Sequence, residues 1–229
     1  MFDAPEGYDI AAEHYDGWKW QRIWARTERP LVCSILKTFR AGLLHAPTIL
    51  DVGVGTGALL DYLVKEIDLG RCYGVDLSRR MLSIASARLN ERAKLQLADV
   101  RQLPFRDGAF DVVLLCRVAT HIREIDSITD EIHRVLCNGG ILIVTDIDSR
   151  HRYEATRIPV RDGKVSIRTY KHSWDEWRRN VSRLNFLVRQ QIVLWSAELI
   201  HGMARTEAPS CLLLSSSQPV SFIFSFEKK

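Results

Sequence analysis

Short apolar runs alternate with longer amphipathic stretches between residues 48 and 147, and this alternation predicts strands that take turns with helices. The expected strands lie at residues 48–52, 71–76, 93–98 and 110–115, with a fifth that ends at Asp146. The expected helices lie at residues 57–67, 78–90 and 125–136, and Gly139-Gly140 is expected to stop the third by supplying the left-handed conformation. An order of this kind is typical of a mostly parallel sheet with helices on both faces, which is a doubly wound α/β fold.

The rest of the chain predicts two more strands and three regions outside this core. The further strands lie at residues 186–195 and 219–226. Residues 157–170 predict a hairpin, because Asp162-Gly163 is a strong turn signal between alternating strands. Residues 196–218 form a loop-rich connection whose role the sequence does not indicate.

The N-terminal region, residues 1–45, contains Tyr8 and Tyr15 seven positions apart on one predicted helical face. Two interpretations stay open. The region could be a helical lid over a binding site, or an amphipathic helix packed against the edge of the sheet.

Length and composition favour one globular domain over residues 1–229, with 46% hydrophobic and 26% charged residues. The first residues lack the basic and apolar parts of a secretory signal, and no stretch is long enough for a membrane span, so we expect a cytoplasmic protein. The five cysteines are odd in number and form no C-x-x-C pair, which indicates neither a disulfide framework nor a metal site.

Three glycines at every second position, Gly53, Gly55 and Gly57, follow the first strand. Glycine allows positive φ and leaves no Cβ in the way of a ligand, and the next helix offers unpaired N–H groups. We therefore expect part of a nucleoside to lie on this turn. The spacing also fits dinucleotide-binding proteins, but Asp51, just before the glycines, would repel a diphosphate and attract a cationic sulfonium or amine.

Acidic residues end the next two strands. Asp76 ends the second strand at about the distance from the glycines expected of a ribose-binding carboxylate. Asp99 and Val100 close the third strand. Beyond them, Leu103-Pro104-Phe105 introduces the strand that starts at Phe110, and the segment from Glu131 to Asp146 has the sequence EIHRVLCNGGILIVTD.

These five ordered motifs resemble the class I S-adenosylmethionine-dependent methyltransferases, of the type that acts on small molecules. The resemblance is close over residues 48 to 147 and covers the rest in outline. It implies a Rossmann-like seven-stranded sheet with an antiparallel C-terminal strand, an N-terminal helical lid and a hairpin insertion at residues 150–172 that roofs the acceptor pocket. It also implies S-adenosyl-L-methionine as cofactor and S-adenosyl-L-homocysteine as product. Cys137-Asn138 departs from the Lys-Pro usual in the family, which affects only a helix end.

The resemblance assigns cofactor roles residue by residue. Asp51 would orient the methionine amine or the glycine turn, Asp76 would hold the ribose, and Asp99 would accept from the adenine amino group. Leu77 and Met81 would flank the adenine, with Val100 beside them. Cys116 and Arg117 would line the methionine end through their backbone. If the N-terminal region is a lid, Tyr8 or Arg22 would reach the cofactor's carboxylate.

Two histidines are candidates for a catalytic base. His121 follows the fourth strand at its carboxyl end, where ligands bind in open α/β sheets. A histidine there could accept a proton from a phenol or alcohol, or it could merely cap the next helix. His14, in the N-terminal region, is the second candidate. Methyl transfer itself mainly needs alignment of donor and acceptor, so a base is optional.

Charge is unevenly placed along the chain. Residues 150–189 carry eleven Lys or Arg against four Asp or Glu, a local balance of +7 in a chain of net charge +4. A solvated basic face explains this, and an anionic small-molecule acceptor or RNA would also fit. We expect methyl transfer to a small molecule, with oxygen slightly favoured over nitrogen or carbon. RNA methylation, cofactor binding without methyl transfer, and an NAD-dependent dehydrogenase are the alternatives.

Overall fold

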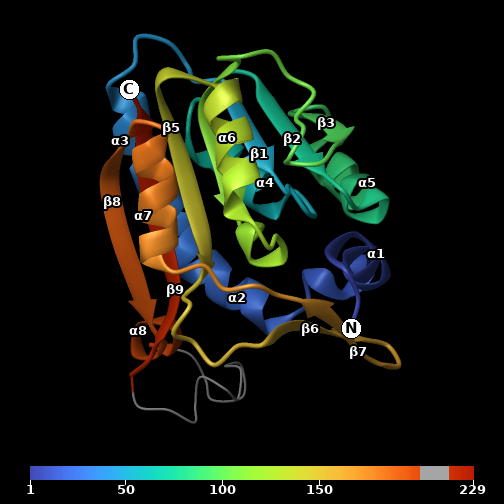
Figure 1. Cartoon of the computed structure of the whole chain (residues 1–229). Coiled ribbons are helices and arrows are strands. Elements are labelled where there is room, and N and C mark those ends of the chain that lie inside the picture. Colours follow the sequence, from blue (N-terminus) through green and yellow to red (C-terminus); the bar gives the residue numbers. More distant parts are fainter. Residues whose placement is uncertain (202–216) are drawn as a thin grey trace.

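A computed structural model describes residues 1–201 and 217–229, and its centre is a seven-stranded sheet in the order β3-β2-β1-β4-β5-β9-β8 (Figure 1). The strands are β1 (Ile49–Val52), β2 (Cys72–Asp76), β3 (Lys94–Leu97), β4 (Phe110–Cys116), β5 (Leu136–Ile147), β8 (Phe186–Trp195) and β9 (Pro219–Lys228). Strands β6 (Ala155–Val160) and β7 (Gly163–Arg168) form a separate hairpin. The helices are α1 (Ala4–Tyr15), α2 (Lys19–Arg26), α3 (Glu28–Ala41), α4 (Ala58–Glu66), α5 (Arg79–Leu89), α6 (Ile125–Val135), α7 (Trp174–Arg183) and α8 (Ser196–Ile200), with a 3-10 turn η1 (Ala119–His121).

Strands β1 to β5 pair in parallel, and β9 lies antiparallel between β5 and β8. The predicted doubly wound seven-stranded sheet with an antiparallel C-terminal strand is therefore confirmed. The chain order reverses between β1 and β4, which places a topological switch point at their carboxyl ends.

Alternate residues of the buried strands enter two separate cores. Ile49, Val112 and Ile143 belong to the core that includes side chains of α3, α4 and α5, whereas Leu50 and Val113 belong to the core shared with α6 and α7. Side chains of a strand point alternately to the two faces of the sheet, so each face of the sheet packs against its own set of helices. Hydrophobic strands of this kind are expected when both faces of a parallel sheet are covered.

The N-terminal segment and the β6–β7 hairpin pack against each other, far from one another in sequence (Figure 1). Phe2 pairs with Ile167 of β7, and its backbone N–H donates to the carbonyl of Ser166 at 2.8 Å. Gly7 of α1 lies so close to Ile167 that a Cβ would come within 2.5 Å of its side chain. The helix α1 and the β6–β7 hairpin therefore form one packed unit.

Two local predictions need correction. Gly139-Gly140 does not end α6, which stops at Val135. These glycines lie in β5, where residues 137–140 bulge opposite the single residue Asp111 of β4. The hairpin turn is Arg161-Asp162, one residue earlier than predicted, because Val160 pairs with Gly163.

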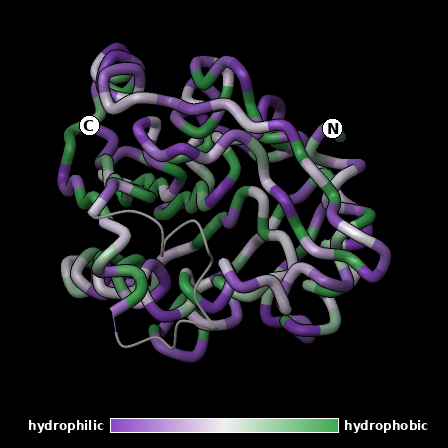
Figure 2. The backbone as a smooth tube through the Cα atoms, turned by 90° about the horizontal axis from the view of Figure 1, so that it is seen from below, coloured by the Kyte–Doolittle hydropathy of each residue, from purple (hydrophilic) through white to green (hydrophobic). Residues whose placement is uncertain are grey.

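Most of the predicted connection at residues 196–218 lies outside the described residues, and its described start contains α8. None of the helices in residues 1–201 and 217–229 combines the length and apolar character that a membrane span requires. Figure 2, which shows the chain from below, has hydrophilic stretches along many of the outer loops.

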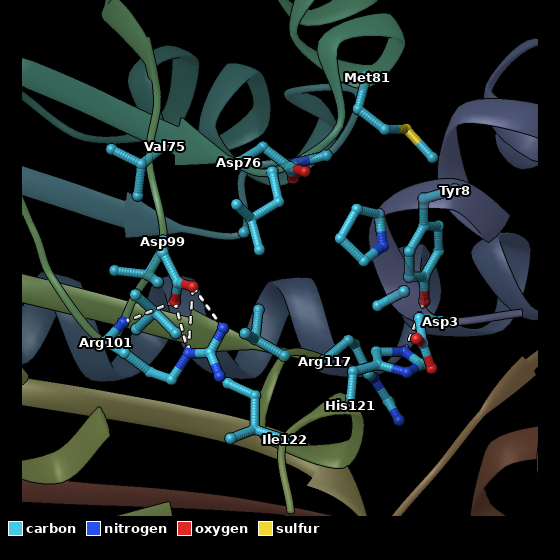
Figure 3. Close-up of a pocket in the computed structure, with 18 of the residues that line it drawn as sticks. Asp3, Tyr8, Val75, Asp76, Met81, Asp99, Arg101, Arg117, His121 and Ile122 are labelled. Carbon is cyan, nitrogen blue, oxygen red and sulfur yellow. Dashed lines mark hydrogen bonds and ion pairs between the residues drawn. The ribbon is translucent and has the colours of Figure 1, made fainter. Parts of the chain in front are cut away.

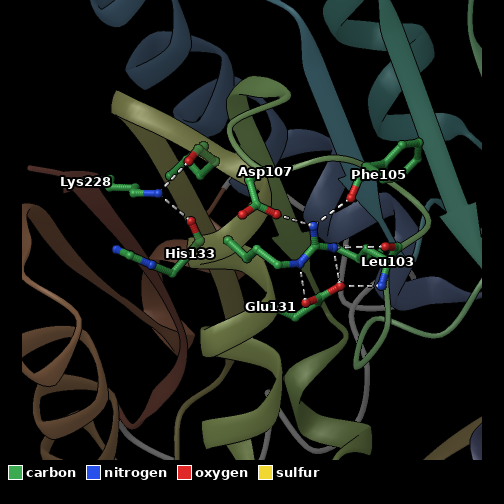
Figure 4. A network of polar contacts seen from close by, with 8 residues as sticks. Leu103, Phe105, Asp107, Glu131, His133 and Lys228 are labelled. Carbon is green, nitrogen blue, oxygen red and sulfur yellow. Dashed lines mark hydrogen bonds and ion pairs between the residues drawn. The ribbon is translucent and has the colours of Figure 1, made fainter.

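Arg134 of α6 fastens the loop that precedes β4, and Figure 4 labels its partners Leu103, Phe105, Asp107 and Glu131. Its guanidinium donates to the carbonyls of Leu103 and Phe105 at 3.0 and 2.7 Å, and to Asp107 at 2.8 Å. Glu131 pairs with the same guanidinium and accepts from the Leu103 N–H. One side chain thus satisfies two backbone carbonyls that would otherwise need water.

We predict that Arg134→Ala lowers the free energy of unfolding by about 2 kcal/mol, because several charge-assisted hydrogen bonds are lost together. In a chain of this size the melting temperature should fall by about 4 to 8 °C in calorimetry. The matched control is Arg183→Ala, which removes a half-exposed pair with Asp130 and should change the unfolding free energy by less than about 1 kcal/mol. Equal losses for the two variants would show that the network does not stabilise the loop.

Candidate active site

A cavity of about 490 Å³ lies where the carboxyl ends of β1, β2 and β4 meet α1 (Figure 3). Its lining includes Asp3, Tyr8, Tyr15, Gly53, Gly55, Val75, Asp76, Leu77, Met81, Asp99, Val100, Arg101, Cys116, Arg117, His121, Arg168 and Tyr170. This is the switch-point edge at which ligands bind in open α/β sheets, and the volume lies in the range of small-molecule pockets.

A second cavity of about 80 Å³ adjoins the first behind the glycine turn. Tyr15, Gly53, Gly55, Cys116 and Arg117 line both. The smaller cavity is also lined by Asp51, Thr56 and Thr145, and by Gln21, Trp24 and Glu28 from α2 and α3. The two together form one elongated site from the end of β3 to the N-terminal helices.

The glycine turn requires glycine at three positions. Gly53, Gly55 and Gly57 have φ angles of 71°, 54° and 74°, in the left-handed region that other residues avoid. A Cβ on Gly53 would also come within 2.2 Å of the Val118 side chain, on the segment after β4. The turn therefore passes close to the end of β4 and leaves its backbone accessible to the cavity.

Asp76, at the end of β2, is bound to the turn. Its Oδ2 accepts a hydrogen bond from the Gly55 N–H at 2.8 Å, and its Oδ1 accepts from the Ser78 N–H at 2.9 Å. Burial raises the pKa of this carboxyl, and the backbone N–H groups oppose that rise. Each oxygen keeps a further lone pair, and Asp76 lines the larger cavity, so it can accept from two neighbouring hydroxyls.

Asp51 lies inside β1, is 2% exposed and lines only the smaller cavity. Burial, with a smaller contribution from Asp76, raises its pKa to about 8, so the carboxyl is mostly neutral at pH 7. A cationic group in the smaller cavity would favour the charged form. Asp51 therefore suits an ammonium group better than an anion.

Asp99 follows β3 and is held by Arg101. The Arg101 Nε and Nη2 donate to its carboxylate at 3.0 and 2.5 Å, and the Arg101 N–H donates to Oδ1 at 2.9 Å. These bonds keep the pKa of Asp99 below its usual range. Val100 and Met81 are buried residues in the wall of the same cavity, and Leu77 is 41% exposed.

Tyr8 of α1 reaches across the cavity to His121 of η1, and their side chains point toward each other in Figure 3. The Tyr8 hydroxyl lies 2.8 Å from Nε2 of His121, whose Nδ1 lies 2.9 Å from the carbonyl of Arg168. A carbonyl can only accept, so Nδ1 carries the proton and the Nε2 lone pair accepts from Tyr8. Desolvation lowers the pKa of His121 to about 4 and raises that of Tyr8, so both are neutral at pH 7.

Residues that sequence reasoning did not select hold the η1 turn in place. The buried Asp146 accepts from the Thr120 N–H at 2.7 Å. The buried His172 lies 2.8 Å from the carbonyl of Ile122 and 3.1 Å from that of Ala119 through Nε2. They are remote from the turn in sequence, and no local signal marks them as its supports.

The structure does not bring His14 or Arg22 into the site. Both side chains are exposed, and neither lines the two cavities. His14 is six residues from Tyr8 and next to Tyr15, so on a helix it points away from the face that those tyrosines share. In α2 the buried positions are Trp20, Gln21, Ile23 and Trp24, which leaves Arg22 on the outer side.

The basic hairpin residues are also mostly outside the site. Arg161 and Lys164 are exposed and do not line either cavity, because the alternate positions Ile158 and Val165 face the core. Arg168 lines the larger cavity and pairs with Asp3 at 3.5 Å. The basic charge of residues 150–189 is therefore not concentrated on the cavity.

Sequence reasoning also missed the ion pair between Glu28 of α3 and Arg117, and the role of Asp9. Asp9 accepts hydrogen bonds from the Ser78 hydroxyl and the Arg80 N–H, which fastens α1 to the start of α5. In the sequence, the only feature that could have pointed to Asp9 is its position next to Tyr8. Within the described parts of the chain, no group of three or more His, Cys, Asp or Glu side chains is placed to hold a metal ion.

Comparison with known proteins agrees with this geometry. Residues 50–144 match a family model described as "Methyltransferase domain". The methyltransferase GfsG of Streptomyces halstedii is 30% identical over 126 residues, which are 53% of this chain and 45% of the relative. The demethylmenaquinone methyltransferase of Porphyromonas gingivalis is 29% identical over 154 residues, 64% of this chain and 59% of the relative. The chain thus spans about half the length of these relatives.

Solved structures share the fold over more of the chain. The structure titled "DhpI-SAH complex structure" has a TM-score of 0.64 at 17% identity and covers 97% of this chain and 94% of its own. The structure of the [4+2]-cyclase SpnF has a TM-score of 0.60 at 18% identity and covers 86% of this chain and 81% of its own. At such identities the likeness concerns the fold.

Replacement of Gly53 tests the close approach between the glycine turn and Val118. We predict that Gly53→Ala lowers the unfolding free energy by about 1 to 3 kcal/mol more than Gly139→Ala, because only the new Cβ of the first overlaps a neighbour. Gly139 is the matched control, with φ of 76° and no atom within 4 Å of a Cβ built there. Urea unfolding of both variants measures the difference, and equal losses would contradict the tight contact.

Proposed function

Because the chain belongs to the class I S-adenosylmethionine-dependent methyltransferases, we propose that it transfers the methyl group of that cofactor to a small molecule. The observation that carries this proposal is the bond between Asp76 and the glycine turn, which turns a carboxylate and an open backbone toward the same cavity. Asp76 would hold the ribose hydroxyls, and Asp99, Val100, Leu77 and Met81 would surround the adenine.

The other end of the cofactor would lie on Gly53, Gly55 and Gly57, beside Cys116. Asp51 would then face the methionine amine, and its neutral carboxyl would lose its proton as the ammonium binds. Tyr15 lines both cavities and would lie alongside the chain that joins the two ends. Each contact follows from position and chemistry in the cavity wall.

The bound cofactor would supply an electrophilic methyl group, so the protein's task is to align the acceptor and exclude water, an effect worth up to about 7 to 11 kcal/mol. If the atom of the acceptor that receives the methyl group carries a proton, Tyr8 and His121 would also take part by removing that proton. The Tyr8 oxygen can accept the acceptor's proton while its own proton passes to Nε2 of His121. This arrangement supports a hydroxyl acceptor, in line with the slight preference for O-methylation.

The proposal does not specify whether the acceptor is an anion or a cation. Arg168 is the one basic hairpin side chain that lines the larger cavity among the described residues, and Asp3 balances it.

The second candidate function is a reaction other than methyl transfer on the same fold. It is kept because one protein with this fold, SpnF, is named as a cyclase. Transfer of a labelled methyl group to any pool of phenols, amines or acidic carbons would favour the first over the second, and transfer to RNA alone would overturn the small-molecule proposal.

Cofactor binding is the first test. We predict that S-adenosylhomocysteine binds the wild type and that Asp76→Ala weakens binding tenfold or more, because each lost charge-assisted hydrogen bond is worth about 1.5 to 3 kcal/mol. Titration calorimetry measures both constants, with the exposed Asp107→Ala as control. An unchanged constant in a folded Asp76→Ala protein would remove Asp76 from the site, and tight binding of NAD instead would contradict the proposed cofactor.

The proton route is the second test. With an acceptor from the labelled-methyl screen, Tyr8→Phe should lower turnover by about 10²-fold, because the ring is kept and the hydroxyl that joins acceptor and His121 is lost. The constant for S-adenosylhomocysteine should change by no more than a few-fold. Tyr170→Phe makes the same chemical change in the same cavity wall and serves as control. Turnover of Tyr8→Phe equal to that control would show that the pair is structural.

A further inference from the structure

The segment that leaves the β6–β7 hairpin, residues 168–172, contacts the η1 turn through every second residue. Figure 1 shows this segment on its way from β7 back to α7. The carbonyl of Arg168 accepts from Nδ1 of His121 at 2.9 Å. The Tyr170 N–H donates to the carbonyl of Thr120 at 2.7 Å, and the Thr120 hydroxyl donates to the Tyr170 carbonyl at 3.1 Å. We call residues 168–172 the clamp, because they hold the turn that carries His121.

His172 closes the clamp at its far end. The residue is 6% exposed, and its Nε2 lies 2.8 Å from the carbonyl of Ile122 and 3.1 Å from that of Ala119. A carbonyl can only accept, so Nε2 carries a proton and donates to both. Since His121 lies between these two residues in the chain, one donor holds the backbone on both sides of it.

The clamp is also held from the side opposite the η1 turn. The Thr169 hydroxyl donates to the carbonyl of Glu154 at 2.8 Å, and the Lys171 ammonium donates to the carbonyl of His151. These residues alternate with the three that contact η1, as side chains on opposite sides of an extended chain do. The clamp is therefore fixed between the turn and the start of the hairpin insertion.

The clamp decides which nitrogen of His121 can accept a proton. In a neutral imidazole, the nitrogen that carries the proton is set by the hydrogen bonds that the ring makes. The Arg168 carbonyl keeps the proton on Nδ1 and leaves the lone pair of Nε2 for the Tyr8 hydroxyl. The other tautomer would present an N–H to Tyr8 and could take no proton from it.

We propose that His172 is a positioning residue for methyl transfer: it holds the η1 turn on the clamp, and the clamp keeps His121 in the tautomer that accepts a proton from Tyr8. The inference rests on the proposed function, because the tautomer affects turnover only if Tyr8 and His121 remove the acceptor's proton. The hairpin insertion then contributes to the reaction through its backbone, although most of its basic side chains lie outside the cavity.

The test compares two variants of His172 that differ in reach. His172→Gln keeps an amide N–H near the position of Nε2, whereas the side chain of His172→Asn is one methylene shorter and does not reach the two carbonyls. NMR of protein with ¹⁵N-labelled histidine distinguishes a ring nitrogen that carries a proton from one that does not. The signals of His121 are identified by their loss in His121→Gln. Wild type and His172→Gln should hold the proton on Nδ1 of His121, and His172→Asn should show a mixture of the two tautomers.

Turnover is the second measurement, with an acceptor from the labelled-methyl screen. His172→Asn should lower turnover about tenfold or more, because a misplaced base loses its alignment with the acceptor. His172→Gln should stay within about threefold of the wild type, and the dissociation constant for S-adenosylhomocysteine should change by no more than about threefold in either variant. His133→Asn in α6, the control, should match the wild type in turnover and in the tautomer of His121.

Thr120→Val and Thr120→Ser are a second pair, which decides the matter if His172→Asn does not fold. Valine removes the hydroxyl that bonds to the Tyr170 carbonyl and serine keeps it, so only valine should shift the tautomer and lower turnover, by about threefold. Equal turnover of the two would then overturn the inference.

Three results would overturn the inference and leave cofactor binding and methyl transfer standing. They are a proton on Nε2 of His121 in the wild type, an unchanged tautomer in a folded His172→Asn protein, and equal losses of turnover for His172→Asn and His172→Gln. Failure of the proposed function has a different signature, because the wild type would then transfer no methyl group whatever the tautomer of His121.

Discussion

The hydrogen bond from the Gly55 N–H to the Asp76 carboxylate, 2.8 Å long, is the contact on which the whole site depends. It joins the turn after β1 to the end of β2, and the N–H groups of Gly53 and Val54 strengthen the same junction by donating to the carbonyl of Val75. Parallel strands end at the same edge of a sheet, so the two segments meet without a long connection. The junction holds the turn in its left-handed conformation and aims the carboxylate at the cavity.

The N-terminal helices complete the site by closing its open side. α1 is held to α5 through Asp9, to η1 through Tyr8 and to the hairpin through Phe2. α3 contributes Glu28, which holds Arg117 between the two cavities. A single N-terminal region therefore provides the roof of the larger cavity and one wall of the smaller one. Of the two interpretations of this region, the lid stays a prediction. Residues of α1 line the larger cavity, and the helix contacts α5 and the hairpin, whereas the alternative expected it against the edge of the sheet.

The sequence predicts the sheet, the glycine turn and Asp76 because these depend on local chemistry. Apolar runs form the strands, and the three glycines are needed where φ is positive. The sequence could not show which face of α1 or α2 meets the cavity, since that depends on packing between segments far apart in the chain. For this reason the sequence could not show that the side chains of His14 and Arg22 are exposed and line neither cavity, or that Glu28 lines the smaller one. The glycines of β5 were misread because a bulge and a helix end use the same conformation.

The crystal structure of the complex with S-adenosylhomocysteine tests the arrangement of the whole site most directly. We expect the ribose hydroxyls within hydrogen-bond distance of Asp76, the adenine beside Val100 and the homocysteine amino group in the smaller cavity beside Asp51. The sulfur should lie on the side of the cavity that holds Tyr8 and His121. A ligand bound elsewhere, or in the reverse direction with its adenine beside Asp51, would contradict the arrangement described above.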